Sequence, residues 1–170
     1  KKKKKEKKKE TEMAEHVELH NGKNGASARV CLHGATVTSW KIGGDELLFL
    51  STESRPAPSP IRGGIPLVFP QFGTGLVEGL PSHGFARRST WMVERKEDAV
   101  VVLTLDEEAI EKEYAEAFPY RFKLAYSVSL QDSGALETRL SVTAVDSFDF
   151  QALLHTYFKV ADVAQCTVTV

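Results

Sequence analysis

Two stretches in the middle of the chain carry side chains that could bind an anion or move a proton. In the first, 61–73, Arg62 is followed by two glycines that would let the backbone approach a ligand, and a guanidinium suits a phosphate or the edge of a polyol. In the second, 80–91, His83 precedes Arg87 by four residues in a glycine-containing loop. An imidazole there can give or take a proton near neutral pH. The plainer interpretations are a surface arginine before a turn and a loop histidine bonded to the backbone.

A third candidate stands in an apolar stretch near the end of the chain. Alternation along 153–158 places His155 on the same face as Tyr157. An imidazole in the middle of an apolar strand is partly desolvated, which disfavours its charged form unless a carboxylate lies nearby. The competing interpretation is a hydrogen-bonded histidine of the core.

Several chemistries lack their characteristic residue patterns anywhere in the sequence. No HxH or HExxH spacing is present, so we predict no metal site. No GxGxxG motif follows a predicted strand, no P-loop motif is present, and no serine stands in a GxSxG elbow.

Short β-strands are the elements that must hold these side chains. Apolar residues recur at every second position in 122–130 and in 136–142, and the polar residues 131–134 between them predict a hairpin. Further strands are predicted at 28–32, 36–41, 47–50, 90–94, 101–105 and 152–160, with one short acidic helix at 107–117. Many short strands with turns between them favour an antiparallel sandwich or barrel.

The segment 54–89 differs from the rest of the chain. It holds six of the seven prolines and six of the twelve glycines. A stretch of this composition cannot form a long regular strand or helix, and long ordered loops are usually functional. Two of the three candidate clusters lie within it.

Composition excludes several classes of protein. The chain is 42% hydrophobic and 26% charged, which excludes a collagen, a mucin-like stalk and a wholly disordered chain. The longest aliphatic run, Ala99–Leu103, is far shorter than the ~20 residues needed to span a bilayer, and no apolar signal-peptide core follows the basic start. Cys31 and Cys166 lie far apart and imply neither a disulfide framework nor a zinc site. We therefore expect a cytoplasmic protein without a membrane partner.

Charge is divided unevenly along the chain. Residues 1–10 carry eight Lys and two Glu, a balance of +6, whereas the rest carries fourteen basic and twenty-one acidic residues, a balance of −7. We interpret 1–12 as a basic, disordered tail and 13–170 as domain sequence, with Met13 resembling a natural start of translation. The acidic body carries no nucleic-acid footprint, so no nucleic-acid partner is expected from it. A module that interacts through its lysine tail is an alternative supported only by that charge run.

Taken together, the three clusters resemble one known family. Arg62-Gly-Gly-Ile-Pro-Leu-Val-Phe-Pro, Pro81-Ser-His-Gly-Phe-Ala-Arg87 and His155-Thr-Tyr-Phe are similar to motifs of the hexose-6-phosphate mutarotases, also called glucose-6-phosphate 1-epimerases. These belong to the galactose-mutarotase-like, aldose 1-epimerase superfamily. The opening stretch 34–41 and Leu50-Ser51 fit as well, and the match runs from about Ala28 to Val160.

The resemblance implies an all-β, antiparallel sandwich of the galactose mutarotase-like type and interconversion of the α and β anomers of a hexose 6-phosphate. Arg62 and Arg87 would bind the substrate, at its phosphate. His155 would be the catalytic acid that protonates the ring oxygen, and His83 would orient or polarise the sugar. Ser82 stands where the family commonly has a substrate-contacting Gln. A small sugar phosphate is the expected partner, no cofactor is expected, and the complete protein is expected to be a monomer.

The chain departs from the family in one respect. The family's general base is a glutamate near the C-terminal end of the domain, preceded by a substrate-contacting aspartate, and neither position exists before Val170. We therefore expect the C-terminal end of the sandwich to be missing, with strand edges left unpaired. The leading hypothesis is a hexose-6-phosphate mutarotase lacking its base, and the alternative is a non-catalytic module that binds sugar phosphates.

Overall fold

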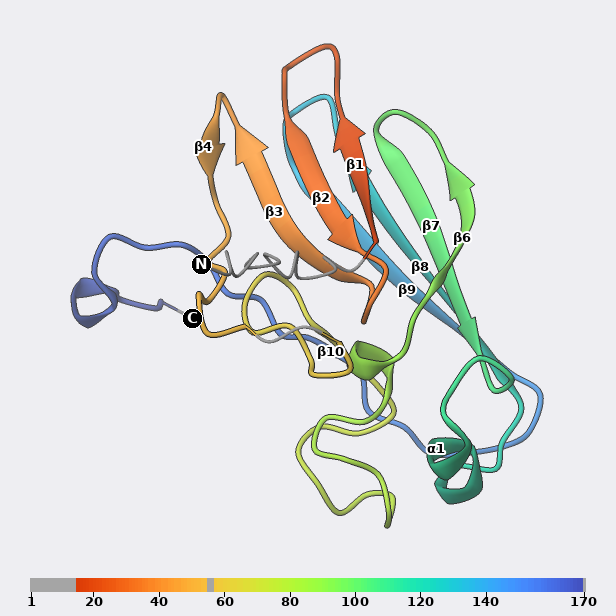
Figure 1. Ribbon diagram of the computed structural model, residues 1–170. Coiled ribbons are helices and arrows are strands. Elements are labelled where there is room, and N and C mark those ends of the chain that lie inside the picture. The colour runs from red at the N-terminus through yellow and green to blue at the C-terminus, as the bar shows by residue number, and fades with distance from the viewer. Residues whose placement is uncertain (1–14, 55–56, 170) are drawn as a thin grey trace, which may run out of the picture.

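Two four-stranded antiparallel sheets form most of the molecule. The computed structural model describes residues 15–54 and 57–169, so the predicted tail at 1–12 lies outside the described residues. One sheet has the order β1-β2-β3-β4 and the other β6-β7-β8-β9. The strands are β1 (His16–His20), β2 (Ser27–Cys31), β3 (Thr36–Ile42), β4 (Asp45–Glu46), β6 (Met92–Lys96), β7 (Val100–Asp106), β8 (Phe122–Leu130) and β9 (Leu136–Ala144). The sheets lie face to face in Figure 1.

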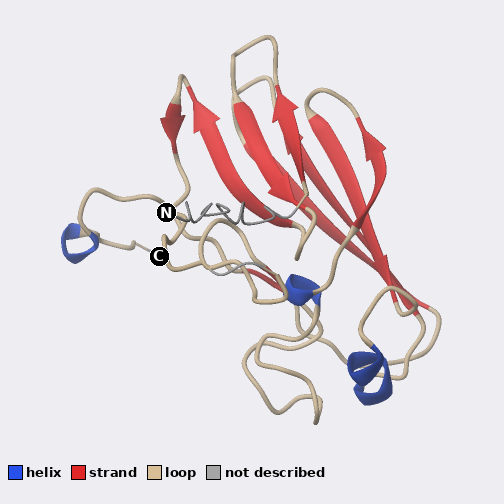
Figure 2. Ribbon diagram, in the orientation of Figure 1, coloured by secondary structure: helices blue, strands red, loops and turns tan. Residues whose placement is uncertain are grey.

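Shorter elements lie at one end of the sandwich, among the loops drawn in tan in Figure 2. Two two-residue strands, β5 (Leu67–Val68) and β10 (Leu153–Leu154), pair with each other. The helical elements are the 3₁₀-helix η1 (Ala86–Arg88), the α-helix α1 (Lys112–Ala117) and the 3₁₀-helix η2 (Val163–Gln165). None of the described helices is long and apolar enough to cross a membrane.

The core between the sheets follows the predicted alternation. Every second residue of β8, from Phe122 to Leu130, is buried, and β8 pairs with β9 through all nine residues. An aromatic cluster extends this core towards the loop end, where Phe69, Phe85 and Phe118 pack edge-to-face or tilted with centroids 5.8–6.2 Å apart. The predicted antiparallel sandwich and the 122–142 hairpin are confirmed.

Three predicted elements are wrong in extent. The helix begins at Lys112 rather than at 107, because the Ala109 N–H bonds to both the backbone and the side-chain oxygen of Asp106 and closes a separate turn first. Segments 47–50 and 152–160 form isolated bridges and the two-residue β10 instead of long strands. Both segments change pairing partner every few residues, which breaks a continuous ladder. Strand β1, with Val17 and Leu19 buried, was not predicted.

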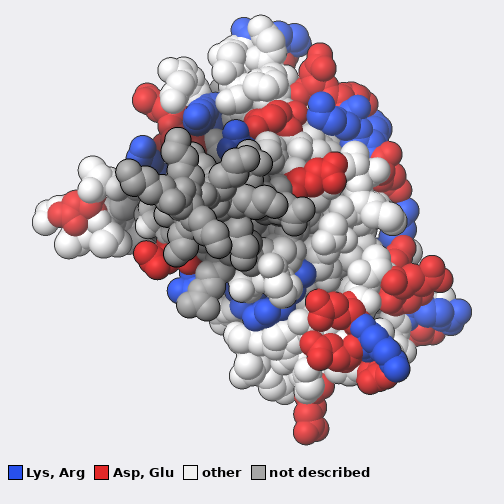
Figure 3. All heavy atoms as spheres, in the orientation of Figure 1, with Lys and Arg blue, Asp and Glu red and all other residues white. Residues whose placement is uncertain are grey.

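Charged side chains of both signs are interspersed on the face seen in Figure 3. Several form exposed ion pairs, including Lys123 with Glu94 (2.8 Å) and Arg29 with Glu18 (2.7 Å). Pairs of this kind contribute little to stability.

Candidate functional site

Backbone pairing among three distant segments builds the floor of the candidate site. Segment 151–159 runs antiparallel to 64–70, where the Tyr157 N–H donates to the Gly64 carbonyl (2.8 Å). Segment 47–51 closes the other side, because the Gly64 N–H donates to a carbonyl within it (2.7 Å). Stretches that are nearly 100 residues apart in sequence therefore lie next to each other.

The two glycines after Arg62 serve this pairing rather than a ligand. Both have positive φ, 114° at Gly63 and 67° at Gly64. A Cβ would overlap the Phe49 carbonyl at Gly63 and the Val37 carbonyl at Gly64. Gly63 does line the cleft, but the space that its side chain would fill is occupied by protein backbone. The sequence-based interpretation, close approach of backbone to a ligand, is replaced by close approach of backbone to backbone.

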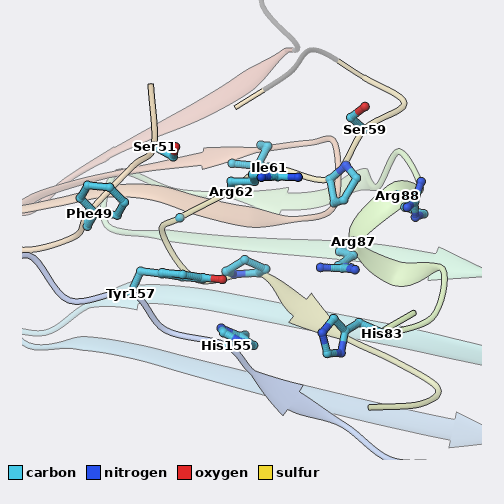
Figure 4. A pocket seen from close by; sticks show the side chains of 13 residues that line it. Phe49, Ser51, Ser59, Ile61, Arg62, His83, Arg87, Arg88, His155 and Tyr157 are labelled. Atoms are coloured by element: carbon cyan, nitrogen blue, oxygen red, sulfur yellow. The ribbon is translucent and has the colours of Figure 1, made fainter. Parts of the chain in front are cut away.

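An open cleft of about 640 Å³ lies over this floor. Four of the five predicted site residues line it: Arg62, Arg87, His83 and His155. Figure 4 shows them around one space, with Arg62 and Arg87 extending into it from opposite sides. Ser82 is exposed and is not among the lining residues. The three separate motifs thus converge on one cleft.

Reciprocal bonds with Gly73 fix the His83 imidazole. The backbone N–H of His83 donates to the Gly73 carbonyl (2.7 Å), and the backbone N–H of Gly73 donates to the ring Nδ1 of His83 (2.9 Å). Because Nδ1 accepts, the neutral ring carries its proton on Nε2. Burial, followed by the charges of Arg87 and His155, lowers the pKa of His83. The backbone of His83 has φ 66°, and the Phe72 ring lies 4.9 Å from the imidazole. His83 is therefore held as a neutral hydrogen-bond donor.

His155 is held from the opposite segment. Its backbone N–H donates to the Pro66 carbonyl (3.0 Å), and its ring stacks on Tyr157 with centroids 4.9 Å apart and an interplanar angle of 22°. The predicted shared face of His155 and Tyr157 is confirmed, although β10 ends at Leu154. The rings of His155 and His83 lie 6.0 Å apart at 65°. Both imidazoles can thus reach one small ligand.

The cleft is cationic. Arg62, Arg87 and Arg88 all line it, and within the described residues none of them forms an ion pair with a carboxylate. Arg87 donates from Nη2 to the Ser82 carbonyl (2.8 Å), which orients the guanidinium. Burial and the neighbouring Arg88 lower the pKa of Arg87, an effect opposed by Tyr157. Unpaired guanidinium groups in a partly buried cleft favour an anionic ligand.

None of the thirteen residues that line the cleft is Asp or Glu. Within the described part of the chain, no group of three or more His, Cys, Asp or Glu is arranged to hold a metal ion. The cleft therefore offers imidazoles and guanidiniums, which can donate protons and bind anions. Among its described lining residues there is no carboxylate that could act as a base.

Comparison with protein families agrees with this geometry. The family described as aldose 1-epimerase matches residues 15–170, nearly the whole chain. The chain belongs to the aldose 1-epimerase family. All three motifs and the cleft that they build lie within the matched residues.

Several individual proteins are also similar to this chain. A protein of Cenchrus ciliaris named "Putative glucose-6-phosphate 1-epimerase" is 35% identical over 167 residues, covering 91% of this chain and 50% of the relative. An Escherichia coli protein of the same name is 32% identical, covering 84% and 48%. The crystal structure of a "putative mutarotase (YeaD)" from Salmonella typhimurium superposes with a TM-score of 0.68 at 32% identity, covering 82% and 47%. The chain spans about half the length of the relatives that it matches.

Among the lining residues that were not predicted as functional from the sequence, Arg88 and Tyr157 carry polar groups of chemical interest. The sequence predicts no role for Arg88, and it predicts for Tyr157 only a shared face with His155. The tandem Arg87-Arg88 next to a candidate histidine was the available signal for Arg88. For Tyr157 the signal was its i+2 spacing from His155, which places both rings on one face.

Proposed function

We propose that the cleft binds a hexose 6-phosphate and provides the acid of a mutarotase reaction. The observation that carries this proposal is the convergence in one cleft of two histidines and three arginines, none of which forms an ion pair with a carboxylate among the described residues. The names of the two curated relatives support glucose 6-phosphate as the ligand.

The arginines anchor the phosphate. Arg62 and Arg87 extend into the same space from different segments, so a phosphate between them would receive charge-assisted hydrogen bonds from both. Anchoring at the phosphate orients the sugar ring without using the reacting atoms. The ring then lies towards His83, His155 and Tyr157.

Mutarotation transfers two protons in opposite directions. A base takes the proton from the C1 hydroxyl, an acid gives one to the ring oxygen, and the C1–O5 bond breaks to leave an aldehyde. Rotation of the aldehyde and closure with the roles reversed produces the other anomer. His155 is the acid, and the Nε2–H of His83 donates a hydrogen bond to the sugar. His83 cannot serve as the base in this tautomer because Nδ1 already accepts from Gly73.

The lack of a carboxylate among the described lining residues favours a second candidate function. A cleft that anchors the phosphate but has no base would bind sugar phosphates without converting them. The two functions share the same ligand and the same arginines, and they differ only in turnover.

The test combines binding with exchange spectroscopy. We expect the chain to bind glucose 6-phosphate and to bind glucose much more weakly, as measured by calorimetry. NMR exchange spectroscopy then compares α–β exchange of glucose 6-phosphate with and without the chain. Accelerated exchange would support the mutarotase, and unchanged exchange with intact binding would support the binding module. No binding of either sugar would refute both.

Substitutions separate the roles within the cleft. Arg62→Gln should weaken binding of glucose 6-phosphate, which a protein acting through its lysine tail would not show. If exchange is accelerated, His155→Ala should remove most of the acceleration while changing affinity only a few-fold, because an acid acts in the transition state. An equal loss in affinity and in exchange would assign His155 to binding instead.

A further inference from the structure

The loop that precedes His83 has no regular structure of its own. In the segment 72–82, all of which the structure describes, Leu80 alone is buried, and no backbone hydrogen bond joins two residues of the segment. The loop nevertheless places the backbone nitrogen of Gly73 2.9 Å from Nδ1 of His83. A loop of this kind keeps such a contact only when other groups hold its ends together.

The side chain of Gln71 holds this loop from the inside. It is fully buried, with an exposed fraction of 0%. Its Oε1 accepts from the backbone N–H of Val77 (2.9 Å), and its Nε2 donates to the carbonyls of Pro81 (3.2 Å) and Leu80 (3.4 Å). A flipped amide would set its oxygen against two carbonyls, so the partners fix the amide orientation. One buried amide therefore joins the beginning, the middle and the end of the loop.

The residue that follows this loop is strained. His83 has φ 66°, a left-handed backbone conformation that residues other than glycine rarely adopt. Such a conformation persists only where the surrounding contacts enforce it. On one side, Gly84 forms a bridge with Phe69 and fixes the chain after His83. On the other side, the backbone N–H of His83 donates to the Gly73 carbonyl (2.7 Å), and that contact depends on the loop.

We propose that Gln71 is a positioning residue for His83. Its amide joins residue 71 to residue 81, and the Gly73–His83 contacts lie two residues further along each segment. The amide therefore sets the separation of the two segments at which the Gly73 N–H reaches Nδ1. That bond leaves the proton on Nε2 of a ring that lines the cleft. Donation of this proton to a sugar rests on the proposed function, whereas the positioning of the ring does not.

A second glutamine bonds to the same loop but is less able to hold it. The Oε1 of Gln151 accepts from the backbone N–H of Phe72 (2.9 Å). Gln151 is exposed, so water can replace this bond at little cost. The three bonds of Gln71 are shielded by its burial, and losing them would leave polar groups of the loop without partners. The two glutamines therefore predict different effects when each is replaced.

The test is amide hydrogen exchange of the ligand-free chain, followed by NMR, which needs no sugar. In the wild-type chain the amides of Gly73 and Val77 should be protected to the same degree, within about threefold, because both become free when the Gln71 bonds open. In Gln71→Met, which keeps the side-chain length, the Gly73 amide should exchange roughly tenfold faster or more. Gln151→Met should change this rate by less than about threefold.

The pKa of His83 provides a second readout in the same samples. It should rise in Gln71→Met, because the Gly73 N–H bonds only to the neutral ring and its loss makes protonation easier. The charges of Arg87 and His155, which also lower this pKa, are the same in both chains. Gln131→Met is the matched control, since its amide bonds to Ser129 and Glu137 in the β8–β9 turn, and it should leave both readouts at their wild-type values.

Urea unfolding separates positioning from a purely structural role. A structural glutamine would lower the free energy of unfolding but leave the Gly73 exchange rate and the His83 pKa of the folded chain unchanged, and that result would overturn the proposal. So would a larger effect in Gln151→Met than in Gln71→Met. Unequal protection of Gly73 and Val77 in the wild-type chain would overturn it without any variant. A chain that shows the expected exchange but binds no glucose 6-phosphate would support the role of Gln71 and refute the proposed function.

Discussion

Replacing Arg87 with glutamine removes a positive charge from the cleft, shortens the side chain by two heavy atoms and keeps a polar group there. Arg87 is partly buried, is held by the Ser82 carbonyl, and has a buried Nε without a hydrogen-bond acceptor. In the proposed complex its remaining donors bind the phosphate. The substitution therefore separates two quantities that usually fall together, namely ligand affinity and the free energy of unfolding.

The expected loss of affinity follows from the contacts. A hydrogen bond to a charged group contributes about 1.5–3 kcal/mol, and each 1.4 kcal/mol is a factor of ten. We expect glucose 6-phosphate to bind Arg87→Gln roughly 10–100-fold more weakly. The free energy of unfolding should fall by less than about 1 kcal/mol or rise, because the variant loses an unsatisfied buried donor and the repulsion from Arg88.

Calorimetry at fixed ionic strength measures the affinity, and urea unfolding measures the stability. Arg95→Gln is the control, since Arg95 is exposed on β6 and paired with Glu97. The His83 pKa, followed by NMR, gives an independent readout and should rise in Arg87→Gln, because the Arg87 charge helps to lower it. An affinity within twofold of wild type, or an equal loss in Arg95→Gln, would refute the assignment of Arg87 to the phosphate.

Three further predictions concern stability. His33 is buried, its Nε2 lies 3.0 Å from the Ser59 carbonyl, and burial is the main cause of its lowered pKa. Its contribution to stability should therefore be complete above about pH 6.5 and decline as the pH falls below that value. In His33→Gln the free energy of unfolding, measured between about pH 5 and 7, should depend less on pH than in the wild-type chain. Gly64→Ala should lower the free energy of unfolding in urea by roughly 2–5 kcal/mol, because left-handed backbone strain adds to overlap with the Val37 carbonyl. Gly43→Ala, with φ 61° and open space around the new Cβ, should lower it by only about 1–2 kcal/mol. Equal losses would contradict the close-approach argument. Phe85→Ala should lower the free energy of unfolding by about 3–5 kcal/mol, because it empties the centre of the aromatic cluster. Met92→Ala, at an exposed position of β6, should change it by less than about 0.5 kcal/mol. A Phe85→Ala chain as stable as wild type would contradict this packing.

The long strands could be predicted because apolar and polar residues alternate along them in the sequence. The β8–β9 hairpin shows alternation over 122–130 and 136–142, and a polar turn fixes its register. Strands β5 and β10 have two residues each, and a two-residue ladder has no period to detect. Segment 152–160 shows both effects, since its alternation correctly placed His155 and Tyr157 on one face but overstated the length of the strand.

The candidate site could be predicted as a set of residues but not as a geometry. The resemblance identified four residues that share the cleft, yet it could not show that Gly73 fixes the His83 tautomer, because that bond joins two loops ten residues apart. The backbone contacts of Gly63 and Gly64 could not be predicted from the sequence either. Their neighbours, Phe49 and Val37, come from segments whose pairing depends on the whole fold.

Anchoring and proton transfer make different demands on this cleft. Phosphate binding needs only donors held in place, and Arg87 is held by the η1 turn, whose Ala86 N–H bonds to the carbonyl of the buried Phe69. Proton transfer needs an acid and a base together. The His83 imidazole cannot be the base while its Nδ1 accepts a hydrogen bond from the Gly73 N–H. The free energy of phosphate binding is available without any base, because it acts away from the reacting carbon. The cleft as described should therefore hold both anomers tightly whether or not it speeds their exchange, so affinity alone cannot reveal which function the chain performs.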